Sequence, residues 1–363
     1  MRGGACCIRD GATSCDGGTS MTVSEGHARR FDDLHIGCFG PGLVWDGDPD
    51  VAMLRDYVRR GAGELQLWRS DGAPLGPIDR LLELPDLLGL RLMPGRRLGA
   101  ADWAVLTQLS QLRWLGCPHP MVGARLDLAA WPALESLQLP WWPALRGLDR
   151  VPLRRLDLDR WRSGGQPLPV DPAALQTLLL RRSDVRDLRG LAHLRSLRCL
   201  CLYGSRQLQS LDGIEQLAEL EELSITGPKN PRLRDLMPLT RCRRLKRLEL
   251  ENCTAVESLP LADLPQLEAV WTRGTPIHDG RLAWLRQCTT LVHTDMESHP
   301  HHDLDVSLLP RAPRLLAYRS PPTYEFSPTV VYPYWQLRNM ETARVFLYPR
   351  WLREQRPDLC LGL

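Results

Sequence analysis

Lysine is almost absent from this chain of 363 residues, since all but two of its 46 basic residues are arginine. The two lysines are Lys229 and Lys246. The formal net charge is only +3, which is too small for this length to indicate a general attraction to nucleic acid. Arginine is spread along the whole chain, so its abundance does not by itself indicate phosphate binding.

Long apolar runs and catalytic motifs are also missing. No stretch approaches the roughly 18 apolar residues of a membrane span, and no basic segment followed by an apolar one marks a secretory signal. We therefore expect no membrane segment and a cytoplasmic location. No glycine-rich phosphate loop, G-x-S-x-G or H-E-x-x-H occurs, so we expect no enzyme, no catalytic residue and no cofactor.

A histidine-rich segment and the cysteines are the remaining candidates for metal or redox chemistry. His299, His301 and His302 lie close together, but Pro300 and their tight spacing disfavour a zinc site. We predict no metal, although the sequence leaves open whether these histidines bind one. The eleven cysteines are odd in number and form no C-x-x-C pair, which favours reduced thiols, either as small buried residues or as inert surface thiols.

Leucine organises the chain, because a Leu-x-x-Leu-x-Leu pattern returns at a nearly fixed step. The penultimate apolar positions of its clearest copies are Leu178, Leu200 and Leu223, which are 22 and then 23 residues apart. Leucines two apart lie on one face of a strand. A repeat this short cannot bury its own apolar face, so it must stack on its neighbours.

Twelve positions continue this series along the chain, and we call them the marker positions. They are Leu65, Leu90, Leu115, Leu137, Leu156, Leu178, Leu200, Leu223, Leu248, Val270, Thr294 and Tyr318. The steps between them vary from 19 to 25 residues, and the pattern is clearest from Leu90 to Val270. One continuous solenoid of about twelve coils is therefore predicted over residues 64–320.

This recurrence resembles the leucine-rich repeat family, in particular its bacterial type with repeats of roughly 22 residues. The resemblance implies an α/β fold, a solenoid bent into a horseshoe arc and capped at both ends. Its parallel sheet would form the concave side, with short helices and loops on the convex side. We expect such helices over 100–109 and 279–287. The resemblance identifies a fold and not a function.

One position departs from the family pattern, which has an asparagine five residues after the marker that bonds the neighbouring turn. This chain has Trp142 and Trp161 at two of these places, and Ser183, Ser205, Cys253 and Thr275 at others. Serine, cysteine and threonine can partly replace that hydrogen bond, but tryptophan cannot. We therefore expect irregular coils around the two tryptophans, which should fill the core.

The ends of the chain differ in composition from its middle. Residues 1–30 are predicted to be a disordered leader, in which Met21 is an alternative start. Residues 31–63 are predicted to be an N-terminal cap, irregular at first and then helical over 51–60, between Asp50 and Gly61. Residues 321–363 are rich in aromatic side chains and are predicted to be a C-terminal cap, with an exposed platform for a partner as the alternative.

Strand alternation places the residues that flank the inward leucines on the concave face. The candidate binding residues there are Asp157, Asp159, Arg181, Tyr203, Glu249, Glu251, Trp271, Arg273, Asp295 and Glu297. Aromatic residues and arginine bounded by charge are typical of interface hot spots. The alternative is a solvated sheet face that has no partner.

We predict a non-catalytic module that binds a protein partner, with the acidic pairs favouring a basic one. A more specific form is an inhibitor or immunity-type factor that masks a basic enzyme, which rests on family analogy alone. The alternative is a nucleic-acid-binding solenoid that uses Arg181 and Arg273 together with Arg241, Arg243 and Arg244. The acidic residues among these arginines make nucleic acid the less favoured partner.

Overall fold

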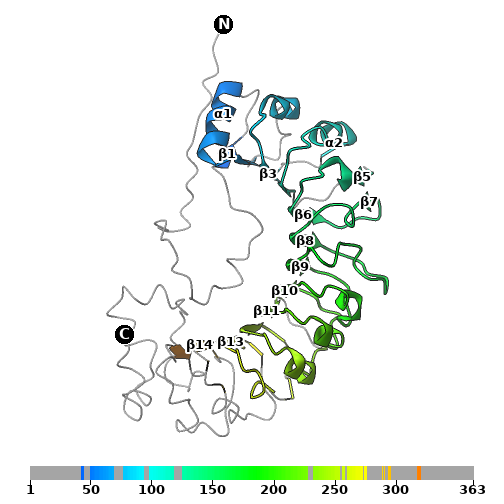
Figure 1. The fold of residues 1–363 in the computed structure, drawn as a ribbon, viewed down its shortest axis with the longest axis vertical. Helices are drawn as coiled ribbons and strands as arrows, with labels where there is room; N and C mark the ends of the chain where they lie inside the picture. Colours follow the sequence, from blue (N-terminus) through cyan, green and yellow to red (C-terminus); the bar gives the residue numbers. More distant parts are fainter. Residues whose placement is uncertain are drawn as a thin grey trace, which may run out of the picture. The chain divides into compact units, whose positions relative to one another are not determined.

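The computed structural model describes residues 42–44, 50–68, 77–93, 98–117, 125–227, 232–253, 256–257, 260–272, 274–275, 288, 290, 293–295 and 317–319. These residues form two compact units. Unit 1 contains those up to residue 161 together with 169–175, and unit 2 contains 162–168 and those from 176 onward. Each unit is a stack of short coils, and each coil contributes one strand to the main sheet of its unit (Figure 1).

Parallel strands in chain order build the main sheet of unit 1. They are β1 (Gly42–Val44), β2 (Glu64–Trp68), β3 (Gly89–Met93), β4 (Trp114–Gly116), β6 (Ser136–Pro140) and β8 (Arg155–Asp159). The marker leucines from Leu65 to Leu156 lie opposite one another on neighbouring strands. A separate two-stranded sheet pairs β5 (Leu126–Asp127) with β7 (Leu145–Arg146).

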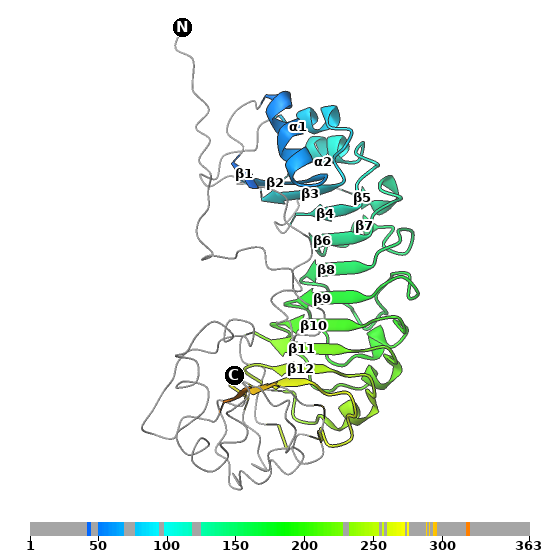
Figure 2. The ribbon, with the colours of Figure 1, turned by 60° about the vertical axis from the view of Figure 1, so that its left-hand side comes forward.

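The strands of unit 2 follow the same rule. They are β9 (Thr177–Arg181), β10 (Cys199–Tyr203), β11 (Glu222–Thr226), β12 (Arg247–Leu250), β13 (Ala269–Trp271), β14 (His293–Asp295) and β15 (Ala317–Arg319). The marker residues from Leu178 to Tyr318 are again opposite one another. Figure 2 shows the strands of each unit stacked in parallel. The predicted marker register is therefore confirmed for the pairs within each unit.

Short helical segments lie on the returns between strands. They are α1 (Val51–Arg60), η2 (Ile78–Glu83), α2 (Ala100–Leu106), η3 (Leu128–Ala130), η4 (Arg189–Leu191), η5 (Ile214–Gln216) and η6 (Met237–Arg241). Leu178, Leu200 and Leu223 are fully buried between strand and return, where each leucine contributes about 1.5–3 kcal/mol to stability. Parallel strands with short helices on the returns make each unit an α/β solenoid, which is the predicted fold class.

The two α-helices begin where the sequence predicts. The Asp50 side chain accepts a hydrogen bond from the backbone N–H of Ala52 at 2.9 Å, and Gly61 ends α1. The second helix, α2, begins at Ala100 but ends at Leu106, three residues before the predicted end, because the chain turns at Thr107. The helix predicted over 279–287 lies outside the described residues.

The positions that replace the family asparagine confirm part of that prediction. The Ser183 and Ser205 hydroxyls are 2.9 Å apart in the core of unit 2. The Thr275 hydroxyl donates to the Leu250 carbonyl and accepts from the Cys253 N–H, both at 3.0 Å. These side chains therefore join neighbouring turns by hydrogen bonds, as asparagine does in the family pattern.

The tryptophans of unit 1 fit the prediction less closely. Trp161 is buried, as expected, whereas Trp142 is partly exposed. The strands on either side of Trp142, β6 and β8, pair regularly over five residues, so the expected irregularity does not reach the sheet. The return between β6 and β8 contains β7. Its pairing with β5 adds a second set of strand contacts between neighbouring coils.

The first strand, β1, was not predicted, since residues 31–45 were expected to be irregular. It pairs with β2 and covers the edge that this strand would otherwise expose. The predicted leader 1–30 with Met21 and the aromatic cap 321–363 lie outside the described residues, as do His299, His301 and His302. In the described part of the chain, no helix is long and apolar enough to cross a membrane.

Candidate functional site

Each strand turns its marker residue toward the core and the flanking residues to the opposite face, which we call the open face. In unit 2 the side chains on this face are Thr177, Leu179, Arg181, Cys199, Cys201, Tyr203, Glu222, Ser224, Thr226, Arg247, Glu249, Ala269 and Trp271. This is the face on which the sequence placed the partner-binding residues.

The middle row of the open face is largely closed to solvent. Leu179, Cys201 and Ser224 face away from the marker leucines, yet all three are buried. Strands about 4.8 Å apart surround each middle position with neighbours on every side, which leaves a short side chain little accessible surface. Contact with a partner therefore depends on the longer side chains at the ends of the strands.

Tyr203 is the main exposed side chain of this face, with 47% of its surface accessible. Its ring lies beside Gly227, where an added Cβ would be 3.3 Å from the Tyr203 Cε2 atom. Gly227 has a φ of +108°, a conformation that other residues adopt only with strain. Because glycine has no side chain, the Tyr203 ring can pack beside this position without a close contact.

Three strands place Arg181, Tyr203 and Thr226 in one row, because these residues are opposite one another at the strand ends. Glu251 continues the row, since its N–H donates to the Ile225 carbonyl at 2.9 Å. We call Arg181, Tyr203, Thr226 and Glu251 the Tyr203 row. It spans about 14 Å at the usual strand spacing, which matches a short peptide segment.

The row is held by backbone hydrogen bonds that continue past the strand ends. The Arg182 N–H donates to the Tyr203 carbonyl and the Gly204 N–H donates to the Thr226 carbonyl, both at 2.7 Å. Such a backbone is rigid, so the side chains of the row are positioned before a partner arrives.

Beside the row, acidic side chains are fixed by lateral contacts between β11 and β12. The Ser224 hydroxyl donates to the Glu249 carboxylate at 2.8 Å. Just before it in both strands, Glu222 forms an ion pair with Arg247. Glu249 and Glu251 are both partly exposed, so they place two carboxylates at one end of the row, with Arg181 at the other.

Trp271 corrects the sequence prediction, which made it an exposed anchor. It lies on the open face, but it is only 8% exposed and belongs to one apolar cluster with Ala269 and Cys199. Small neighbouring side chains leave room for the indole to pack, and burial of its large apolar surface is favourable. Trp271 is thus a structural residue of the face.

The acidic pair of unit 1 is also placed differently from the prediction. Asp157 is only 1% exposed, and its carboxylate accepts a hydrogen bond from the Gln138 Nε2 atom at 2.7 Å. Asp159 is partly buried, 3.8 Å from the Arg160 guanidinium. These carboxylates support the sheet, and Asp157 is not available to steer a partner.

The last predicted site residues are described only in part or not at all. Asp295 lies in β14, paired with Trp271, and its side chain is outside the description. Arg273 and Glu297 lie outside the described residues altogether. The part of the predicted site that the structure brings together is therefore Arg181, Tyr203, Glu249 and Glu251.

Sequence reasoning missed a recurrent turn that ends the strands from β8 to β13. The residue four places after the marker has a positive φ in each of these coils, at Arg160, Arg182, Gly204, Gly227, Asn252 and Gly274. Glycine and asparagine at a fixed offset are the sequence signal of a left-handed turn. This turn directs the chain away immediately after the Tyr203 row.

The described cysteines of unit 2 provide no reactive group for this face. Burial raises the pKa of Cys242, Cys253 and Cys288 to about 12, so these thiols stay protonated at neutral pH. Cys199 and Cys201 are buried, as are the other described cysteines. Of the two predicted alternatives, the described cysteines are therefore small buried residues and not surface thiols.

Solved structures of low sequence identity match most of this chain. An internalin from Listeria monocytogenes is 16% identical, with a TM-score of 0.46, and the match covers 78% of this chain and 86% of the internalin. A leucine-rich repeat protein from Leptospira interrogans is 14% identical, with a TM-score of 0.37, and the match covers 75% of this chain and 86% of that protein.

A complex of TLR13 with ssRNA13 is 16% identical to this chain, with a TM-score of 0.50. That match covers 76% of this chain and 42% of the TLR13 chain. At these identities the likeness concerns the fold alone. No protein-family model matches the sequence, and no curated protein matches it either.

Proposed function

We propose that this chain, which has the leucine-rich repeat fold, is a non-catalytic module that binds a protein partner through the open face of unit 2. The observation that carries the proposal is Tyr203, a large aromatic side chain that is 47% exposed on a face whose middle row is largely closed to solvent. Tyrosine is enriched among hot-spot residues because it offers a large apolar ring and a polar hydroxyl together.

A protein segment suits this surface better than a small molecule. The Tyr203 row is a line of side chains along the strand ends. The middle-row residues beside it, Leu179, Cys201 and Ser224, are buried, so a partner can contact this face mainly along that line. An extended segment can follow such a line and place successive side chains on Tyr203, Thr226 and Glu251. Rigid backbone under the row reduces the entropy lost when the segment binds.

The charges of the row favour a partner with a basic side chain at one end. Glu249 and Glu251 provide two carboxylates beside Thr226, and the hydrogen bond from Ser224 fixes the first of them. Opposite charges steer the encounter and set the register of the bound segment. An inhibitor or immunity-type factor that masks a basic enzyme would use the same surface, and it remains a specific form of this proposal.

Nucleic acid is the less favoured partner because the arginines do not lie together. Arg181 ends β9 on the open face, whereas Arg241, Arg243 and Arg244 lie on the return before β12. Arg244 forms an ion pair with Glu219, and the Arg243 Nη1 atom donates to the Asp263 carbonyl at 3.2 Å. A phosphate-binding surface needs a continuous basic patch.

Affinity capture from the native host tests the proposal. The bait is the full chain, compared with a Tyr203→Ala/Glu251→Lys variant and with a Met237→Ala/Glu257→Lys control. Met237 and Glu257 are exposed in unit 2 but lie outside the Tyr203 row, so the control matches both changes in size and charge.

The expected result is a protein that wild type and control retain and that the row variant loses. The loss of one hot-spot side chain with one charge reversal should weaken binding by about a hundredfold. A partner retained equally by both variants would exclude the Tyr203 row. Capture of RNA or DNA in place of a protein would favour the nucleic-acid alternative.

A further inference from the structure

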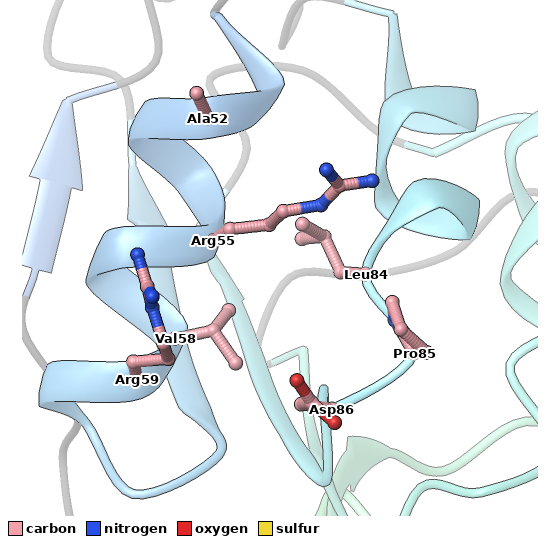
Figure 3. A pocket seen from close by; sticks show the side chains of 7 residues that line it. All are labelled: Ala52, Arg55, Val58, Arg59, Leu84, Pro85 and Asp86. Carbon is pink, nitrogen blue, oxygen red and sulfur yellow. The ribbon is translucent and has the colours of Figure 1, made fainter.

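Unit 1 contains a pocket between α1 and the segment that follows η2. Its volume is about 420 Å³ and its lining residues are Ala52, Arg55, Val58, Arg59, Leu84, Pro85 and Asp86. Pockets that bind ligands or side chains measure roughly 300–1,000 Å³. Figure 3 shows the helix forming one wall and the residues 84–86 forming the other.

The pocket combines an apolar base with two guanidinium groups. Val58 and Leu84 are buried, so they provide a firm apolar base. Arg55 extends from α1 toward Leu84 (Figure 3), and its Nε and Nη2 atoms donate to the Glu83 carbonyl at 3.4 and 3.3 Å. These bonds hold the guanidinium across the pocket while using only part of its five N–H donors.

Arg59 provides a second charge at the pocket. Its side chain runs along α1 on the same wall (Figure 3) and is 71% exposed, with a contact of 3.9 Å to the Asp56 carboxylate. An ion pair of this kind between exposed groups contributes little energy. Arg59 can therefore exchange Asp56 for the carboxylate of a bound ligand at small cost.

Asp86 decides which anionic ligand fits. Its exposed carboxylate lines the opposite wall, facing α1. A polyphosphate or a nucleic acid strand carries a charge at every step, so it would meet repulsion from Asp86. An acidic peptide carries its charge on side chains and offers backbone N–H groups, which a carboxylate binds well.

We propose that this pocket binds an acidic peptide segment of a protein partner. A glutamate or aspartate side chain of that segment pairs with Arg55 and Arg59, and a neighbouring apolar side chain rests on Val58, Leu84 and Pro85. A backbone N–H of the segment donates to Asp86. The pocket is a second site, separate in chemistry from the open face, and does not depend on the function proposed for the Tyr203 row.

The test uses the full chain and a fluorescein-labelled peptide of alternating glutamate and leucine, followed by fluorescence anisotropy. A peptide with glutamine in place of glutamate measures the contribution of charge. Arg59→Glu is the test variant, and Arg60→Glu is its matched control, because Arg60 is equally exposed on α1 but does not line the pocket. Both variants change the charge near the end of the same helix.

We expect Arg59→Glu to weaken binding of the glutamate peptide by about tenfold or more, since it removes one charge-assisted pair and adds a repulsion. Arg60→Glu should change the affinity by less than about threefold, as expected for a screened charge outside the pocket. The glutamine peptide should bind wild type about tenfold more weakly than the glutamate peptide.

A second variant tests the pocket itself. Ala52 is exposed and lines the pocket, so Ala52→Phe fills the space without removing a core side chain and should abolish peptide binding. The proposal is overturned if Arg59→Glu and Arg60→Glu have equal effects, if Ala52→Phe leaves binding unchanged, or if wild type does not bind the glutamate peptide at millimolar concentration. Stronger binding of single-stranded RNA than of the peptide, lost in Arg59→Glu, would overturn it in favour of nucleic acid.

Discussion

In each unit the marker residues of neighbouring strands lie opposite one another, but the interiors of the two units are filled with different side chains. Among the described residues, unit 1 buries Trp103, Trp114, Trp131 and Trp161, and a single cysteine, Cys117. The described part of unit 2 buries one tryptophan, Trp271, and the cysteines Cys199, Cys201, Cys242, Cys253 and Cys288. The marker residues lie opposite one another in both units, so the register does not depend on what fills the remaining space.

The difference follows from how each unit joins its neighbouring turns. In unit 2, Ser183 with Ser205 and Thr275 with the backbone around Cys253 make hydrogen bonds from turn to turn. In unit 1, the Trp131 Nε1–H donates to the Leu106 carbonyl at 3.2 Å. The ring of Trp161 occupies the position, five residues after the marker, that Ser183 and Ser205 occupy in unit 2. A regular repeat can therefore be supported either by a polar ladder or by large apolar side chains.

The largest expected effect comes from Trp161→Ala in unit 1. Removal of this buried ring leaves a cavity and should lower the free energy of unfolding by about 4 kcal/mol. Urea unfolding measures the loss, and amide hydrogen exchange should show it concentrated in unit 1. An equal loss of protection in both units would show that the two do not differ in their support.

Thr275→Val in unit 2 should have the next largest effect. Valine keeps the volume of threonine but removes both hydrogen bonds of the Thr275 hydroxyl, which leaves the Leu250 carbonyl and the Cys253 N–H without this partner. The expected loss is about 2–3 kcal/mol, measured by urea unfolding. A loss below about 0.5 kcal/mol for Thr275→Val would contradict a stabilising ladder.

A smaller effect is expected for the Ser183–Ser205 hydrogen bond. Its energy can be measured with Ser183→Ala, Ser205→Ala and the double variant. The two hydroxyls are 2.9 Å apart and buried, so their coupling energy should be about 1 kcal/mol in a double-mutant cycle. Strictly additive losses would mean that the pair contributes nothing beyond the volume of its side chains.

Alkaline pH should weaken unit 2 through its buried thiols. Burial raises the pKa of Cys253 from 9.0 to about 12, with Thr275 opposing and Glu251 adding to the shift. The unfolded thiol ionises first, so the stabilising contribution is complete below pH 9 and is lost as the pH rises toward 12.

Cys253→Ala should reduce this loss by at most about 1.4 kcal/mol per pH unit between pH 9 and 12. Urea unfolding at pH 8 and at pH 10 measures the slope for wild type and variant. Cys117→Ala, which removes the buried cysteine of unit 1, is the comparison. Identical slopes for wild type and Cys253→Ala would show that this thiol is not shielded.

Much of the fold follows from the leucines themselves. Even Thr294 and Tyr318, which are not leucines, lie opposite their neighbours at the marker positions, because the step from coil to coil fixes them. The helix α1 follows from Asp50 and Gly61, which are local signals. The candidate site follows less closely, since alternation correctly places Tyr203 and Trp271 on one face but does not distinguish the exposed ring from the buried one.

The sequence by itself determined the marker register and the face on which each strand residue lies, because these depend on periods of two and of about 22 residues along one chain. Only the tertiary structure decided exposure on that face. Asp157 accepts a hydrogen bond from Gln138, and Trp271 shares an apolar cluster with Cys199. Both partners come from other strands. The pocket under Arg55 and Arg59 arises in the same way, from a helix and a return that meet only after folding.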